Sequence, residues 1–219
     1  MKLIRKTRDG RRRTVWLLGF RLFSYGRDKK GHVSVPPGNV VEGVPRGCRV
    51  VIYGSANSVV FHEPVARIFD GRICIGSPDC PVNGCTVDIG ADCTSNGVDI
   101  RLMEDGSRLE FGRDCMLSEG VKIWVSDTHA ITDGEGRLVN EGRFVSLGDH
   151  VWLGHGASVL KNSRIPAGTV VGAGAVFVGS RLKEENCVVA GNPAIVVKRG
   201  VVWHRERPKQ WMSKMDVRE

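Results

Sequence analysis

The chain has 219 residues, enough to bury a substantial core as one principal domain with terminal appendages. It carries 28 glycines and few aromatic residues, which without a collagen period indicates many tight turns between short strands. No apolar run approaches the ~20 residues of a membrane-spanning helix. The stretch TVWLLGF is closed by Arg21 and lacks the cleavage site of a signal peptide. Composition therefore excludes collagen-like and membrane-spanning chains, and we expect a soluble cytoplasmic protein.

Residues 1–32 are expected to form a basic, aromatic N-terminal arm. They hold eleven Lys and Arg against two Asp, a net charge of +9, whereas the remainder of the chain carries −1. The interleaving of arginines with Trp16, Phe20 and Tyr25 suggests, as one hypothesis, peripheral contact with an anionic membrane surface at the inner membrane face. Steering of a polyanionic glycan and a strand pair packed on the main domain are alternatives. Nucleic acid is not an expected partner, because the main domain is not basic.

Residues 33–199 are expected to form the main domain, which repeats every six residues. From Leu147 the sequence reads LGDHVW, LGHGAS, VLKNSR, IPAGTV and VGAGAV, with an aliphatic first position and a small or β-branched fifth position. Such a period suits a short strand and a turn, one side of a triangular solenoid with about 18 residues per coil. Related hexads at 89–94 and 111–122, and short β-rich pieces between 33 and 88, extend the pattern upstream. The predicted fold class is all-β, a solenoid of parallel sheets.

The seven cysteines are odd in number and contain no CxxC pair. We expect free, mostly buried thiols in a reducing cytoplasm. Cys93 and Cys115 fall on the fifth position of a hexad, which favours a packing role. The spacings of Cys74, Cys80, Cys85 and Cys93 match no common zinc module.

A loop at 125–145 interrupts the repeat without shifting its register. The stretch SDTHAITDGEGRLVNEGRF is polar and contains glycine, so we expect it to protrude from the solenoid. It places His129 between Asp127 and Asp133. Histidine, with an ordinary pKa of ~6.5, is suited to removing a proton from a hydroxyl at neutral pH, and a carboxylate can fix its tautomer. Either aspartate can take that part; a surface histidine in a flexible loop is the non-catalytic alternative.

Three linked pieces of the sequence resemble the hexapeptide-repeat acyltransferases: SDTHAITD, LGDHVWLGHGASVLKNSRIPAGTVVGAGAVF and VVAGNPAIVVKR. The resemblance covers 87–199, and the order of the pieces is most similar to polysaccharide, capsule and lipopolysaccharide O-acetyltransferases. It implies a left-handed parallel β-helix, acetyl-CoA as co-substrate, no metal, and a homotrimer with sites between subunits. Residues 200–219 would be a C-terminal extension with a short helix.

The resemblance also assigns roles to single residues. The family's catalytic histidine falls on His129, and Trp152 would line the pocket where acetyl-CoA and the acceptor meet. Ala173 would offer a backbone contact to pantetheine, and Lys198 and Arg199 would hold phosphates. Two departures from the family pattern, VGS at 178–180 and Ile195 in place of a basic residue, mean that some phosphate contacts must differ. The candidate substitutes are Lys161, Arg164, Arg181 and Lys183.

The expected function is acetyl-CoA-dependent O-acetylation of a sugar hydroxyl in a capsule, lipopolysaccharide or sialic-acid-containing glycan. His129 would act as general base while both substrates are bound. N-acetylation of an amino sugar or of a small molecule is the alternative within enzymes. The pair His150 and His155 suggests a zinc enzyme like the γ-class carbonic anhydrases, but other signature residues of that class are missing. A non-catalytic solenoid is the remaining alternative.

Overall fold

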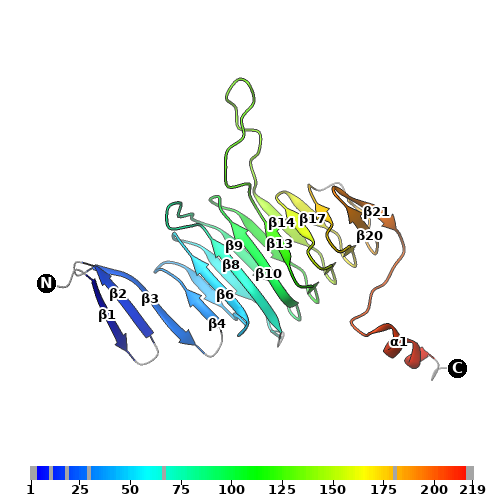
Figure 1. The fold of residues 1–219 in the computed structure, drawn as a ribbon, viewed down its shortest axis with the longest axis horizontal. Coiled ribbons are helices and arrows are strands. Elements are labelled where there is room, and N and C mark those ends of the chain that lie inside the picture. Colours follow the sequence, from blue (N-terminus) through cyan, green and yellow to red (C-terminus); the bar gives the residue numbers. More distant parts are fainter. Residues whose placement is uncertain are drawn as a thin grey trace.

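The computed structural model describes residues 4–9, 12–17, 20–28, 31–65, 68–179 and 182–215. Most strands stack into a parallel β-helix whose coils follow one another along the long axis, with one long loop projecting from its side (Figure 1). Each regular coil contributes one short strand to each of three faces. The fold is the left-handed parallel β-helix that the sequence predicts.

The three faces are parallel sheets. Face 1 consists of β12 (Met116–Leu117), β15 (Trp152–Leu153), β18 (Val170–Val171) and β20 (Val188–Gly191). Face 2 consists of β4 (Gly31–Ser34), β6 (Cys48–Ile52), β13 (Val121–Trp124), β16 (Ser158–Leu160) and β19 (Val176–Phe177). Face 3 consists of β5 (Val40–Glu42), β7 (Ser58–Phe61), β9 (Thr86–Ile89), β11 (Arg108–Phe111), β14 (Phe144–Leu147) and β17 (Ser163–Ile165). Two longer strands, β8 (Phe69–Ile75) and β10 (Thr94–Leu102), run through faces 1 and 2.

Antiparallel pieces occupy both ends of the solenoid. At the N-terminal end β1 (Ile4–Asp9), β2 (Arg12–Leu17) and β3 (Phe20–Asp28) form a meander that joins face 2 through β4 (Figure 1). At the other end β21 (Ala194–Lys198) folds back on β20. The tail then continues to the short helix α1 (Pro208–Met215), as the sequence predicts. No helix in the described part of the chain has the length and apolarity needed to cross a membrane.

The hexad positions explain the core. The aliphatic first positions point inward and are at most 2% exposed, as at Leu147, Leu153 and Ile165. The small fifth positions are also buried, because they lie where the chain turns into the next face. Coils approach so closely there that a Cβ on Gly154 would lie 2.7 Å from the Ala173 nitrogen. Burial of this repeated aliphatic row supplies the main drive to fold.

The cysteines largely follow the prediction of buried thiols. Five of them are buried in the solenoid: Cys48, Cys85, Cys93, Cys115 and Cys187. Cys74 is half-buried and Cys80 is exposed, so the packing role does not extend to Cys80.

Candidate active site

A long loop leaves the solenoid between face 2 and face 3. It begins after β13, where Val125 and Ser126 are still buried, and ends where β14 starts at Phe144. Beyond its base it closes on itself through a bridge between Thr132 and Leu138, so it forms a narrow projecting hairpin-like finger (Figure 1). The predicted loop is therefore present at the predicted place.

Three polar side chains hold the base of this loop together. The Asn140 amide donates to Asp127 Oδ2 at 2.9 Å and to the His129 carbonyl at 2.8 Å. Lys161, from the corner of the next coil, donates to the Asp127 carboxylate and to the Asn140 carbonyl. We call Asp127, Asn140 and Lys161 the clip. The clip fixes the backbone on both sides of His129.

The backbone at Thr128 is strained where the loop presents His129. Thr128 has φ +69°, a conformation that β-branched residues rarely adopt. Such strain persists only where the surroundings impose it, and it clusters at functional sites. Here the clip bonds the residues on both sides of Thr128, namely Asp127 and the His129 carbonyl, and the His129 side chain is exposed to solvent.

The two candidate carboxylates both have partners other than the His129 ring. Hydrogen bonding from Lys161, then from Asn140, lowers the pKa of Asp127 below its ordinary value. Asp133 accepts from the amides of Glu135 and Arg137 and from Arg137 Nε at 2.8 Å, and these bonds, chiefly from Arg137, lower its pKa. No side chain in the described part of the chain hydrogen-bonds the His129 ring. Asp127 accepts from the Asn140 and Lys161 side chains at the base of the loop, and Asp133 holds the turn farther out.

Trp152 lies on the other side of the solenoid. It is half-buried on face 1, and its indole nitrogen donates to the Ser118 hydroxyl at 3.1 Å. The Trp203 ring lies beside it, 5.9 Å away between centroids. In a triangular coil, face 1 is opposite the corner where faces 2 and 3 meet, and His129 projects from that corner. A single chain therefore does not bring His129 and Trp152 together.

The residues predicted to contact acetyl-CoA are exposed near the C-terminal coils. Ala173 lies in the turn between face 1 and face 2, and Lys198 ends β21. Arg199 is paired with Glu184 at 3.0 Å, which offsets its charge. Among the substitutes, Lys161 is engaged in the clip, Lys183 is exposed, and Arg181 lies outside the described residues.

His150 has a structural environment that sequence reasoning missed. Its Nδ1 lies 2.7 Å from Asp114, and its Nε2 lies 3.0 Å from the Trp203 carbonyl. The His150 and Trp203 rings are stacked, with their centroids 3.9 Å apart. Arg205 adds donations to Asp114 and to the Thr94 hydroxyl at 2.6 and 2.8 Å. The tail thus packs along the solenoid as a strap. Over the described ranges of this one chain, no group of three or more His, Cys, Asp or Glu could hold a metal ion.

A triangular parallel solenoid with a long loop at one corner defines the class of parallel β-helix proteins. The sequence is 42% identical to the polysialic acid O-acetyltransferase of Neisseria meningitidis over 78 residues, 35% of this chain and 36% of that protein. It is 30% identical over 148 residues to a Dictyostelium discoideum protein named "putative acetyltransferase", covering 67% of this chain and 68% of the relative. The structure of the polysialic acid O-acetyltransferase OatWY is similar, with a TM-score of 0.61, 28% identity, and coverage of 83% of this chain and 91% of that one.

No family model matches the sequence. The relatives and the shared fold nevertheless show that the chain belongs to the hexapeptide-repeat acyltransferases. The chain spans little more than a third of the length of the first two curated relatives, 36% and 39%.

Proposed function

We propose that the chain transfers an acetyl group from acetyl-CoA to a sugar hydroxyl of a cell-surface polysaccharide: a capsule, a lipopolysaccharide or a sialic-acid-containing glycan. The observation that carries the proposal is the presentation of His129 on a loop whose base is clipped to the solenoid. The names of two relatives, both polysialic acid O-acetyltransferases, support the choice of acceptor.

The chemistry assigned to His129 is general base catalysis. Its unprotonated ring nitrogen takes the proton of the acceptor hydroxyl while the oxygen attacks the thioester carbonyl. The C–S bond then breaks, and the acetyl group stays on the sugar oxygen. CoA leaves as a thiolate, and the proton taken from the hydroxyl is held at that moment by the His129 imidazolium. Asp127 contributes as an ionised anchor bound to Lys161, and because these bonds lower its pKa it stays charged to a lower pH than an ordinary aspartate. A backbone N–H is the expected oxyanion donor.

A complete site requires two chains. Because His129 and Trp152 lie on opposite sides of one solenoid, we propose a homotrimer with three sites between subunits. His129 would come from one subunit, and Trp152, Ala173, Lys198 and Arg199 from its neighbour. Closed cyclic symmetry makes each subunit contribute both halves once.

The N-terminal arm is proposed to hold the enzyme at the inner face of the membrane. This proposal rests on the sequence of residues 1–32, whose net charge of +9 and interleaved apolar residues suit an anionic surface. Co-sedimentation with anionic vesicles should be lost when residues 1–32 are removed. Equal binding of both forms would refute the membrane contact.

Thiol release from acetyl-CoA tests the reaction, with polysialic acid, lipopolysaccharide and amino sugars as acceptors. Loss of the base should lower the rate in His129→Ala by about 100-fold or more. His204→Ala is the matched control, since His204 is an exposed histidine on the C-terminal tail, stacked on Trp211. Full activity of His129→Ala would refute the mechanism, and release only with amino sugars would replace O-acetylation by N-acetylation.

Mixing two inactive variants tests the division of the site. A random mixture of His129→Ala and Trp152→Ala subunits should regain about a quarter of the active sites, because mixed trimers contain one interface with both intact residues. No recovery after subunit exchange would place both residues in one subunit and contradict the proposed arrangement.

A further inference from the structure

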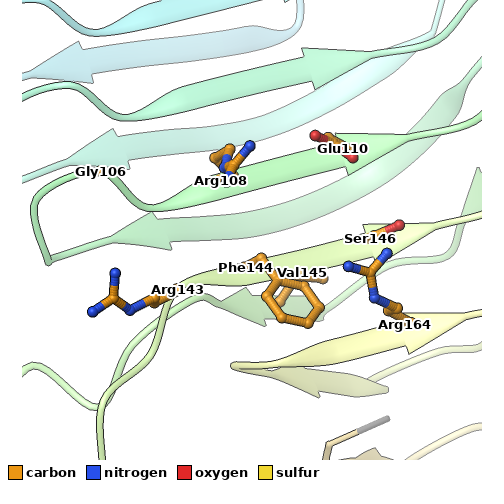
Figure 2. Close-up of a pocket in the computed structure, with 8 residues that line it drawn as sticks. All are labelled: Gly106, Arg108, Glu110, Arg143, Phe144, Val145, Ser146 and Arg164. Carbon is orange, nitrogen blue, oxygen red and sulfur yellow. The ribbon is translucent and has the colours of Figure 1, made fainter.

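A hollow of about 240 Å³ lies on face 3, immediately beside the base of the loop. Its outward-facing lining comes from three successive coils: Arg108 on β11, Phe144 and Ser146 on β14, and Arg164 on β17. The register stacks these positions directly, with Arg108 opposite Phe144, and Ser146 opposite Arg164. Figure 2 shows arginine side chains on either side of Phe144 and Ser146. We call this feature the arginine hollow.

The arginine hollow has a surplus of positive charge. Arg143, at its rim, is paired with Glu141. Arg108 and Arg164 have no carboxylate within 4.0 Å among the residues that the structure describes. Arg164 instead lies over the Phe144 ring, 4.6 Å from the centroid. Two guanidinium groups with free donors therefore flank one small cavity, an arrangement that favours a planar, bidentate anion such as a carboxylate.

The hollow is rigidly connected to the base of the loop. The Arg143 backbone bridges two coils, because its carbonyl accepts from the Arg108 amide at 2.8 Å and its amide donates to Asn162 at 3.1 Å. Only two residues lie between Arg143 and Asn140, whose side chain donates to the His129 carbonyl. A group bound in the hollow therefore lies next to the base of the loop that carries His129 in the same chain.

The remaining lining distinguishes one kind of anion from another. Phe144 offers an apolar surface for the C–H face of a sugar ring, and Ser146 and Glu110 offer partners for hydroxyls. Glu110 would repel a multiply charged phosphate more strongly than a singly charged carboxylate. The volume is below the roughly 300–1,000 Å³ of pockets for drug-sized ligands, so it suits one sugar unit.

We infer that the arginine hollow binds the carboxylate of an acidic sugar in the acceptor glycan, and so makes this chain selective for acidic polysaccharides. The inference rests on the proposed acetyl transfer and names its substrate class. An adjoining hollow on the same face shares Arg108, Glu110 and Ser146 with the arginine hollow, so the surface open to a longer glycan continues along face 3.

Binding can be tested without catalysis. A fluorescein-labelled sialic acid oligomer is titrated against full-length His129→Ala protein, alone and combined with Arg108→Gln or Arg164→Gln. Each arginine substitution should weaken binding by about five- to tenfold and flatten its salt dependence. Arg113→Gln is the matched control, because Arg113 is an exposed arginine of the same coil outside the hollow, and it should bind as the parent does. Equal thermal unfolding of all variants establishes that they fold.

Two further arms identify the ligand. The same oligomer with its carboxyl groups reduced to alcohols should bind the parent weakly and be unaffected by the substitutions. In otherwise active protein, the substitutions should raise KM for the acidic glycan and leave KM for acetyl-CoA unchanged. The inference is overturned if the parent does not bind the oligomer, if the reduced oligomer binds as tightly, or if only KM for acetyl-CoA changes, which would mark a phosphate site. Absence of thiol release with every acceptor would refute the proposed function while leaving the binding result standing.

Discussion

The clip at the base of the loop gives the most direct test of how the structure holds His129. Replacing Lys161 by Met keeps most of the side-chain volume but removes the ammonium that bonds Asp127 and the Asn140 carbonyl. A hydrogen bond to a charged group contributes about 1.5–3 kcal/mol when shielded from water. Lys161 is 17% exposed but Asp127 is 38% exposed, so screening reduces the gain, and we expect the clip to stabilise the closed loop by about 1–2 kcal/mol.

Losing about 1–2 kcal/mol of stabilisation of the closed loop raises the population of the open loop by about 5- to 30-fold. Hydrogen exchange measures it directly, because the Ile131 amide donates to the Asn140 side chain at 2.8 Å and the Val139 amide donates to Ile131 at 2.9 Å. Both amides should lose protection by that factor in Lys161→Met. In Lys122→Met, which changes an exposed lysine on face 2, they should not. Unchanged protection in Lys161→Met would refute the reasoning, whatever the activity.

Three further predictions concern titration, the strap and the thiols. Because the pKa of Asp127 is lowered in the folded protein, its stabilisation of the closed loop is complete above the ordinary pKa of ~3.9 and is lost only as pH falls below that value. Protection of the loop amides, corrected for intrinsic exchange, should therefore be constant from about pH 5 to 8. Arg205→Ala should lower the free energy of unfolding in urea by about 1–2 kcal/mol, since it removes the charged bonds of the strap to Asp114, which are partly screened by solvent. A thiol reagent should label exposed Cys80 first in the native protein, because burial raises the pKa of Cys48 to about 12; fast labelling that survives Cys80→Ser would contradict this.

The regular coils could be predicted because their constraints are local and repeated. Every side of a coil needs an inward aliphatic residue and a small residue near the corner. The hexads from Leu147 onward repeat these two constraints, so each of them independently indicates the same fold. The earlier coils are harder to recognise because β8 and β10 run around a corner as single strands of 7 and 9 residues. Gly71 allows this bend, with φ +154° and no room for a Cβ, which would lie 2.5 Å from the Val98 carbonyl oxygen.

The candidate site could be predicted only in part. His129 stands out because it lies in the one long polar interruption of the repeat. The groups around His129 do not stand out in the sequence, because they come together only when the coils stack. Lys161, for example, bonds Asp127 although 34 positions of sequence separate them. The Trp203 carbonyl meets His150 across 53 residues. No spacing rule in a single sequence connects such pairs, since each depends on which coil lies above which.

The geometry of the coil gives the proposed mechanism its division between subunits. The arginine hollow lies on face 3, which borders the corner that carries His129, so the proposal assigns acceptor binding and proton removal to the same chain. Trp152 lies on the opposite face, and Ala173 and Lys198 belong to later coils, so the proposal takes the groups assigned to acetyl-CoA from a neighbouring chain. In the proposed homotrimer each subunit would present the acceptor on one side and the acetyl donor on another. Assembly would then be a requirement for bringing the hydroxyl to the thioester, which the mixing of His129→Ala and Trp152→Ala subunits tests.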